Sequence, residues 1–122
     1  MIRLIDETGQ LEELTFAEYQ DIALDFAIYS EQNAVIYPAL KLSGEAGEVS
    51  EKVGKRLRDA GGDFEDLEWR ESMKKELGDV LWYISALADD LGYTLEEVAD
   101  TNLSKLSSRV ARGVLQGSGD DR

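Results

Sequence analysis

The fold of this chain is decided by residues 69–91, which read WRESMKKELGDVLWYISALADDL. Apolar residues recur there every three or four positions, which is the heptad-like pattern of a helix packed along its length. The repeating positions are Leu77, Val80, Leu81, Ile84, Leu87, Ala88 and Leu91. Gly92 follows the last of them and is well placed to end the helix. We therefore predict a long helix from about Trp69 to Leu91.

This helix carries apolar side chains on more than one side, because Trp82, Tyr83 and Ala86 lie off the repeat. Exposed aromatic rings are unfavourable in water, so a second packing surface is expected. We predict a homo-oligomer that associates through this helix, as a homodimer or a homotetramer. The alternative is that Trp82 packs within its own chain.

Two capping boxes, each a Thr followed three residues later by a Glu, predict two further helix starts. They are Thr15 with Glu18 and Thr94 with Glu97. The first should open a helix that runs to about Ser30. The second should open a helix that runs to about Arg112.

Another helix is predicted between these two, with Pro38 in its first turn and residues 31–37 as the connection before it. Its apolar face consists of Leu42, Ala46, Val49, Val53 and Leu57. Gly61 and Gly62 should stop it just after Asp59. Residues 63–68 then either frame a short helix or form a plain connecting loop.

Together these segments predict an all-α fold, in the form of a four-helix bundle-like protomer. The chain has 122 residues, which is enough for one domain. We predict that residues 1–14 are an N-terminal extension and that residues 15–112 form the helical domain. Residues 113–122 contain three Gly and no apolar repeat beyond Leu115, so a flexible tail is expected.

The composition excludes several classes of function. The chain has 13 Lys and Arg against 26 Asp and Glu, a net charge of −13, so binding to nucleic-acid phosphates is not expected. It has no His and no Cys, which excludes imidazole bases, thiolate chemistry and zinc sites built from those ligands. No apolar run approaches the roughly 20 residues of a membrane span, and the first residues do not resemble a signal peptide. We therefore expect a cytoplasmic protein that does not bind membranes.

Two pairs of carboxylates stand three residues apart, Glu45 with Glu48 and Glu76 with Asp79. That spacing places both members of a pair on one side of a helix, at the edge of its apolar stripe, where two packed helices can bring all four together. Converging carboxylates repel one another unless a cation is present, and ligands that are all oxygen favour Mg²⁺ or Mn²⁺ over zinc. The alternative is a solvated acidic face, which arises by chance in an acidic chain.

Small and cationic residues surround these pairs. Gly44, Gly47 and Gly78 lie inside predicted helices, where Gly costs about 1 kcal/mol relative to Ala, so we expect room for a ligand or a close helix contact there. The cations and amides at helical spacing are Lys52, Lys55 and Arg56 in one helix and Asn102, Lys105 and Arg109 in another. Such groups beside a carboxylate-bound metal suit a phosphate chain, although ordinary surface ion pairs are the alternative for each.

At these residues the sequence resembles the MazG-like, all-α nucleoside triphosphate pyrophosphohydrolases. The resemblance extends from about Thr15 to Arg112 and is strongest in LSGEAGEVSEKVGK at 42–55 and KELGDVLWYISAL at 75–87. An E-x-x-E followed by an E-x-x-D, here with 27 residues between Glu48 and Glu76, is the signature of that family. The resemblance implies a helical oligomer that binds Mg²⁺ and cleaves a nucleoside triphosphate to the monophosphate and pyrophosphate.

Carried over by position, the resemblance makes Glu45, Glu48, Glu76 and Asp79 the metal ligands and catalytic carboxylates. It makes Lys55, Lys105 and Arg109 candidates for the phosphate chain, Asn102 for the sugar or phosphate, and Tyr83 for stacking or a sugar contact. The chain departs from many members at Gly44, where they carry a second Glu. Glu51 is the nearest acid that could take over from that carboxylate.

A different class of function is also open, because an acidic helical bundle could be an interaction module or a DNA mimic without catalysis. Release of pyrophosphate that depends on Mg²⁺ would discriminate between the two. The sequence is equally compatible with ribose and deoxyribose substrates, and with control of nucleotide pools or removal of aberrant nucleotides. Phe26, Tyr29, Asn33 and Trp82 are candidate pocket residues, but ordinary core or interface packing is the interpretation that we favour for them.

Overall fold

The computed structural model describes residue 8 and residues 14–122, and this part of the chain contains helices and no strand. The elements are α1 (Phe16–Leu24), the 3₁₀ turn η1 (Glu31–Asn33), α2 (Ile36–Ala60), α3 (Leu67–Asp90) and α4 (Leu95–Ala111). The predicted all-α fold is confirmed. None of these helices is both long and apolar enough to cross a lipid bilayer.

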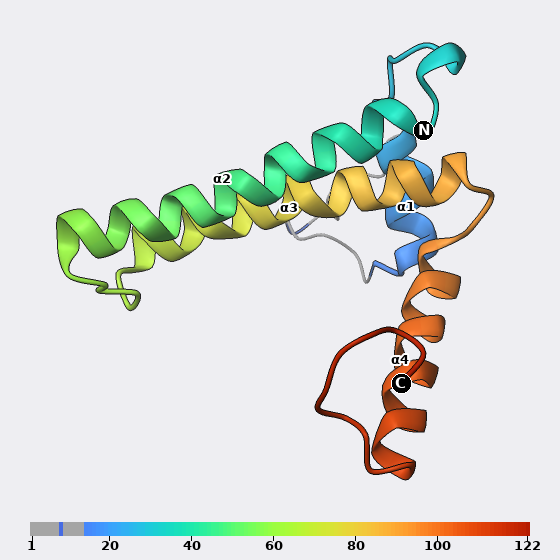
Figure 1. Cartoon of the computed structure of the whole chain (residues 1–122). Coiled ribbons are helices and arrows are strands. Elements are labelled where there is room, and N and C mark those ends of the chain that lie inside the picture. The colour runs from blue at the N-terminus through green and yellow to red at the C-terminus, as the bar shows by residue number, and fades with distance from the viewer. Residues whose placement is uncertain (1–7, 9–13) are drawn as a thin grey trace.

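The helices are arranged around one long hairpin (Figure 1). α2 and α3 lie side by side and antiparallel, and α1 packs against α3 at the end of the hairpin that is distant from its turn. α4 contacts α1 and α3 and then points away from the hairpin. The fourth helix therefore does not pack along the other three within one chain.

The helix starts follow the local signals in the sequence. Thr15 and Glu18 form the capping box of α1, with Glu18 N–H donating to Thr15 Oγ1 at 3.2 Å and Thr15 N–H donating to Glu18 Oε2 at 2.9 Å. The box of α4 is equivalent, with bonds of 3.0 and 3.1 Å between Thr94 and Glu97. Both boxes satisfy backbone N–H groups that have no partner inside the helix.

The hairpin turn also lies where the sequence predicts it. Gly61 and Gly62 both have positive φ, of 63° and 79°, which Gly adopts at low cost. Residues 63–66 form a loop, and α3 begins after Asp66, whose side chain accepts a hydrogen bond of 2.9 Å from Trp69 N–H. Of the two alternatives for residues 63–68, the loop holds as far as Asp66.

The prediction that the first helix runs to about Ser30 is wrong, because α1 ends at Leu24. Its last turn tightens, with Phe26 N–H donating to the carbonyl of Ala23 at 3.1 Å. The chain then turns so that the Tyr29 hydroxyl reaches the carboxylate of Asp90, 61 residues later, at 3.0 Å. A tertiary contact of this kind overrides a local helical pattern.

The core lies where α1, α3 and α4 meet. Its buried residues are Gln20 and Ala23 on α1, Ser85, Ala86 and Ala88 on α3, and Leu95 on α4. Gln20 connects all three helices, because its amide donates to the carbonyls of Ser85 and Tyr93, each at 3.2 Å, and accepts from Leu95 N–H at 3.1 Å. This side chain therefore sets the position at which α4 leaves α3.

Trp82 packs within its own chain, which was the alternative to its packing in an oligomer interface. Its indole Nε1 donates to the carbonyl of Ala23 at 3.0 Å, which holds α1 against α3. Other apolar side chains of α3 stay uncovered, and Leu67 and Leu77 are 72% and 56% exposed. Oligomerisation through this helix stays a prediction.

Residues 113–122 fold back along α4 in this structure (Figure 1, red). The guanidinium of Arg122 donates to the carbonyls of Val114, Leu115 and Gly119. Arg112 in turn donates to the carbonyl of Arg122 at 2.6 Å. The flexibility expected of this tail stays a prediction.

Candidate metal centre

Three carboxylates from α2 and α3 converge on one point. One oxygen each of Glu45, Glu76 and Asp79 lies within 4.8 Å of the others. Glu45 and Glu76 are half-buried and Asp79 is exposed. Three acidic oxygens at this separation repel one another and offer a hard divalent cation the ligands that it prefers.

Glu48 does not join this group. Its side chain is exposed one turn after Glu45, and the acidic cluster found among the described residues contains only the other three predicted ligands. Two residues spaced by three on a helix differ by about 60° in direction, which leaves Glu48 free to turn toward solvent. The sequence therefore predicted four convergent carboxylates, of which the structure brings three together.

Lys52 supplies a positive charge to the cluster. Its Nζ lies 3.0 Å from Glu76 Oε1 and also donates to the carbonyl of Ser72 at 3.5 Å. The side chains of Lys52 and Glu76 are 33% and 19% exposed, so this pair is less screened than a fully exposed one. Lys52 follows Glu45 by seven residues, and this spacing of two helix turns is the signal that could have paired it with the cluster.

Two tyrosine hydroxyls lie beside these carboxylates. Burial raises the pKa of Tyr83 to about 12, together with a hydrogen bond to Tyr37 and the negative charges of Glu45 and Asp79. Burial also raises the pKa of Tyr19, with a smaller contribution from Asp79. Both groups stay protonated at neutral pH and can donate hydrogen bonds. Sequence reasoning missed Tyr19, because it lies on a helix remote in sequence.

Lys55 and Glu51 lie outside the cluster. They form an i,i+4 ion pair of 3.0 Å, and both side chains are more than half exposed. Such pairs contribute little to stability. In this structure Lys55 forms an ordinary surface ion pair, and Glu51 is not among the three convergent carboxylates. The roles that the resemblance suggests for these two residues stay predictions.

The helical glycines leave open space rather than close contacts. A Cβ built on Gly44, Gly47 or Gly78 would meet no described atom within 4 Å, apart from its chain neighbours and the nearby backbone of its own helix. The expectation of a close helix contact is therefore not met within one chain. Space beside the carboxylates is available to a ligand or to another molecule.

The polar residues of α4 lie apart from the carboxylates. Asn102 and Lys105 border a cavity of about 620 Å³ on α4, together with Tyr93, Glu97, Val98 and Thr101. Because α4 points away from the α2–α3 hairpin (Figure 1), the structure does not bring these residues to Glu45, Glu76 and Asp79 of the same chain.

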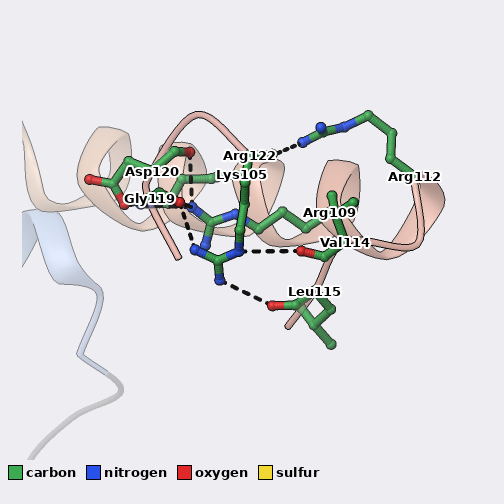
Figure 2. Close-up of polar contacts among 8 residues, drawn as sticks. All are labelled: Lys105, Arg109, Arg112, Val114, Leu115, Gly119, Asp120 and Arg122. Carbon is green, nitrogen blue, oxygen red and sulfur yellow. Dashed lines mark hydrogen bonds and ion pairs between the residues drawn. The ribbon is translucent and has the colours of Figure 1, made fainter. Parts of the chain in front are cut away.

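The tail engages Lys105 and Arg109, two of the three cations that the resemblance assigns to phosphate binding (Figure 2). Arg109 is buried, and its Nη2 donates to the carbonyls of Gly119 and Asp120 at 3.2 and 2.9 Å. Lys105 Nζ lies 3.2 Å from the carboxylate of Asp120, and this contact holds the pKa of Asp120 below its usual range. A phosphate could contact Arg109 Nη2 only if these tail atoms moved away.

The four candidate pocket residues border an aromatic cavity. Phe26, Tyr29, Asn33 and Trp82 line a space of about 380 Å³, together with Ile28, Tyr37 and Tyr83. Phe26 is 56% exposed. The packing interpretation holds for the indole Nε1 of Trp82, whereas Phe26 lies beyond the end of α1 and is not part of the core of one chain. Packing of Phe26 in an interface stays a prediction.

Comparison with known proteins agrees with this geometry. The model of the MazG nucleotide pyrophosphohydrolase domain matches residues 38–113, a range that contains all four acidic positions and α4. The chain is also 46% identical over 110 residues to the Gene 37 protein of Mycobacterium phage L5, covering 85% of this chain and 96% of that protein. No solved structure matches the chain.

Proposed function

Because this chain belongs to the MazG nucleotide pyrophosphohydrolase family, we propose that it is a Mg²⁺-dependent enzyme that converts a ribo- or deoxyribonucleoside triphosphate to the monophosphate and pyrophosphate. The observation that carries the proposal is the convergence of Glu45, Glu76 and Asp79 from two adjacent helices within 4.8 Å. A chain without His or Cys has few other ways to activate a phosphoanhydride.

The residues of the cluster fit a hard divalent cation. All three side chains offer oxygen, and the ammonium of Lys52 forms an ion pair with one of them, Glu76, at 3.0 Å. Glu45, Glu76 and Asp79 would hold Mg²⁺, or Mn²⁺ in its place. When bound, the ion supplies positive charge that offsets the charge of the reacting phosphate oxygens.

The remaining polar groups have separate roles in this proposal. Glu48, one turn after Glu45 and exposed, accepts a proton from the attacking water and orients it. Tyr83 donates its hydroxyl to the sugar, since its raised pKa keeps it protonated. Lys55 attracts the phosphate chain by its positive charge without touching it. Its Nζ already forms an ion pair with Glu51 at 3.0 Å.

We also propose that the active enzyme is a homo-oligomer. Large apolar side chains are exposed on two helices, among them Leu77 on α3 at 56% and Leu103 on α4 at 63%. Burying such side chains against a second copy would remove apolar surface from water. Because α4 points away from its own carboxylates, Asn102, Lys105 and Arg109 would serve the cluster of a second copy.

Mixed oligomers test this arrangement. Asp79→Ala and Lys105→Ala should each lose most activity alone, and subunits of the two variants mixed in equal amounts should regain about a quarter of the wild-type rate. In a dimer this recovery arises because half of the molecules are mixed and each of those carries one intact site. Activity that stays at the level of the two separate variants would show that α4 does not serve a second copy.

The reaction itself is tested by measuring pyrophosphate released from a panel of nucleoside triphosphates, both the usual bases and damaged ones. We expect release with Mg²⁺ or Mn²⁺ and none with EDTA. The products should be a monophosphate and pyrophosphate in equal amounts. Absence of turnover across the panel, with the fold intact, would favour the acidic interaction module instead.

A further inference from the structure

The aromatic cavity shares a wall with the carboxylate cluster. Its ring centres form a series of contacts, from Tyr29 to Tyr37 at 5.2 Å, from Tyr37 to Tyr83 at 6.2 Å and from Tyr83 to Trp82 at 4.9 Å. Tyr83 belongs to both features, because it lines the cavity and lies close enough to Glu45 and Asp79 for their charges to raise its pKa. A molecule whose phosphates lie at the carboxylates can therefore place an attached ring in the cavity.

The chemistry of the cavity suits a flat heteroaromatic ring. Tyrosine and tryptophan faces stack on any nucleobase, and each stacked base contributes substantially to affinity. The side chain of Asn33 lines the same space, and its amide can both donate and accept hydrogen bonds at the edge of a base. A volume of about 380 Å³ is at the lower end of the range of small-molecule sites.

One carboxylate outside the cluster holds the loop that forms the far wall. Asp90 Oδ2 accepts a hydrogen bond from the Tyr29 hydroxyl at 3.0 Å and another from the backbone N–H of Val35 at 2.8 Å. Burial and the bond to Asp90 raise the pKa of Tyr29 to about 12, so the hydroxyl remains a donor at neutral pH. A single oxygen at the end of α3 thus fixes both ends of the segment 29–35.

Val35 is held in a strained conformation. Its φ of 68° and ψ of −51° place it in the left-handed region, and among the described residues it alone does so without being Gly. Ile36 N–H donates to the carbonyl of Ala34 at 2.7 Å across it, which makes a classic γ-turn. Such a turn is strained for a β-branched residue and persists only where the surroundings enforce it. α2 begins at the next residue, so this turn sets the direction from which Tyr37 enters the cavity.

We propose that Asp90 is a positioning residue that enforces this γ-turn and so shapes the aromatic cavity for the base of the nucleotide, an inference that rests on the proposed function. Asp90 does not touch the substrate. It acts through Tyr29, whose ring lines the cavity, and through Val35, whose conformation sets the position of Tyr37.

Kinetics of Asp90→Ala test the proposal. We expect the KM for the nucleoside triphosphate to rise about tenfold, the loss expected when stacking of one base is weakened, with kcat within about twofold of wild type. The Ki of pyrophosphate, a product without a base, should stay within about twofold. Asp90→Asn keeps an acceptor oxygen and should restore most of the KM. An unchanged KM, or a Ki that rises together with the KM, would overturn the proposal.

A second substitution separates the γ-turn from a general loss of structure. Gly adopts positive φ without strain, so Val35→Gly added to Asp90→Ala should bring the KM back toward the wild-type value. If Asp90 merely stabilised the fold, the added Gly would lower the melting temperature further and leave the KM raised, and the proposal would be wrong.

Binding without turnover keeps this inference separate from the proposed reaction. In a Trp69→Phe background, Trp82 is the only remaining tryptophan, and its fluorescence can be titrated with nucleoside monophosphates in EDTA. Quenching that Asp90→Ala weakens about tenfold and Asp90→Asn retains would support the cavity assignment even if no triphosphate were hydrolysed. No quenching by any monophosphate would overturn it, whatever the enzyme hydrolyses.

Discussion

Replacing Asp79 by alanine is expected to lower kcat by about a thousandfold or more while leaving the helices intact. The carboxylate is one of three that converge within 4.8 Å, and its loss removes one of the ligands proposed to hold the cation. Electrostatic stabilisation by a bound metal is worth several kcal/mol, and each 1.4 kcal/mol corresponds to a factor of ten in rate.

Asp79 is exposed and has no role in the core, so its removal should change the circular dichroism spectrum and the melting temperature little. Glu71→Ala is the matched control, because Glu71 is another acid on α3 whose ion pair of 2.7 Å with Lys74 lies on the surface. That variant should keep near-normal kcat. Equal activity of wild type and Asp79→Ala would remove Asp79 from the catalytic site.

Replacing Gln20 by alanine is expected to destabilise the protein by about 2–4 kcal/mol, because it removes three buried or half-buried hydrogen bonds and leaves the carbonyl of Tyr93 and the N–H of Leu95 without partners. The loss should appear as a drop of roughly 10 °C in melting temperature and as a lower urea midpoint with an unchanged m value. Both should be measured at one protein concentration, since oligomerisation adds to apparent stability.

Ser85→Ala provides the opposite case within the same core. Ser85 is fully buried and its Oγ has no hydrogen-bond partner in the part of the chain that the structure describes, so its removal should be neutral or stabilise the fold by up to about 1 kcal/mol. The two variants together separate loss of hydrogen bonds from loss of buried volume. A Gln20→Ala variant as stable as wild type would show that this amide does not join α1, α3 and α4.

Local features of the fold were predictable from the sequence. Capping boxes at Thr15 and Thr94 and left-handed glycines at 61 and 62 act over a few residues, and the structure has them in place. The convergence of Glu45 with Glu76 and Asp79 was also predictable, because helical periodicity places each pair at the edge of an apolar stripe.

Features that depend on contacts between remote residues were not predictable. α1 ends at Leu24 because Tyr29 is drawn to Asp90, and no local signal marks that end. The direction of α4 depends on the bonds from Gln20 to Tyr93 and Leu95, which lie more than seventy residues away. Periodicity gives the face of a helix on which Glu48 lies but not its rotamer, and only the structure shows that its side chain is exposed and outside the group of three.

The central claim is that Glu45, Glu76 and Asp79 together hold one hard cation. Anomalous diffraction from crystals grown with Mn²⁺ tests it most directly. We expect one manganese peak between α2 and α3, with an oxygen of each carboxylate about 2.1 Å from it. A map with no peak among these three side chains, or with their oxygens turned apart, would contradict the metal centre and the function built on it.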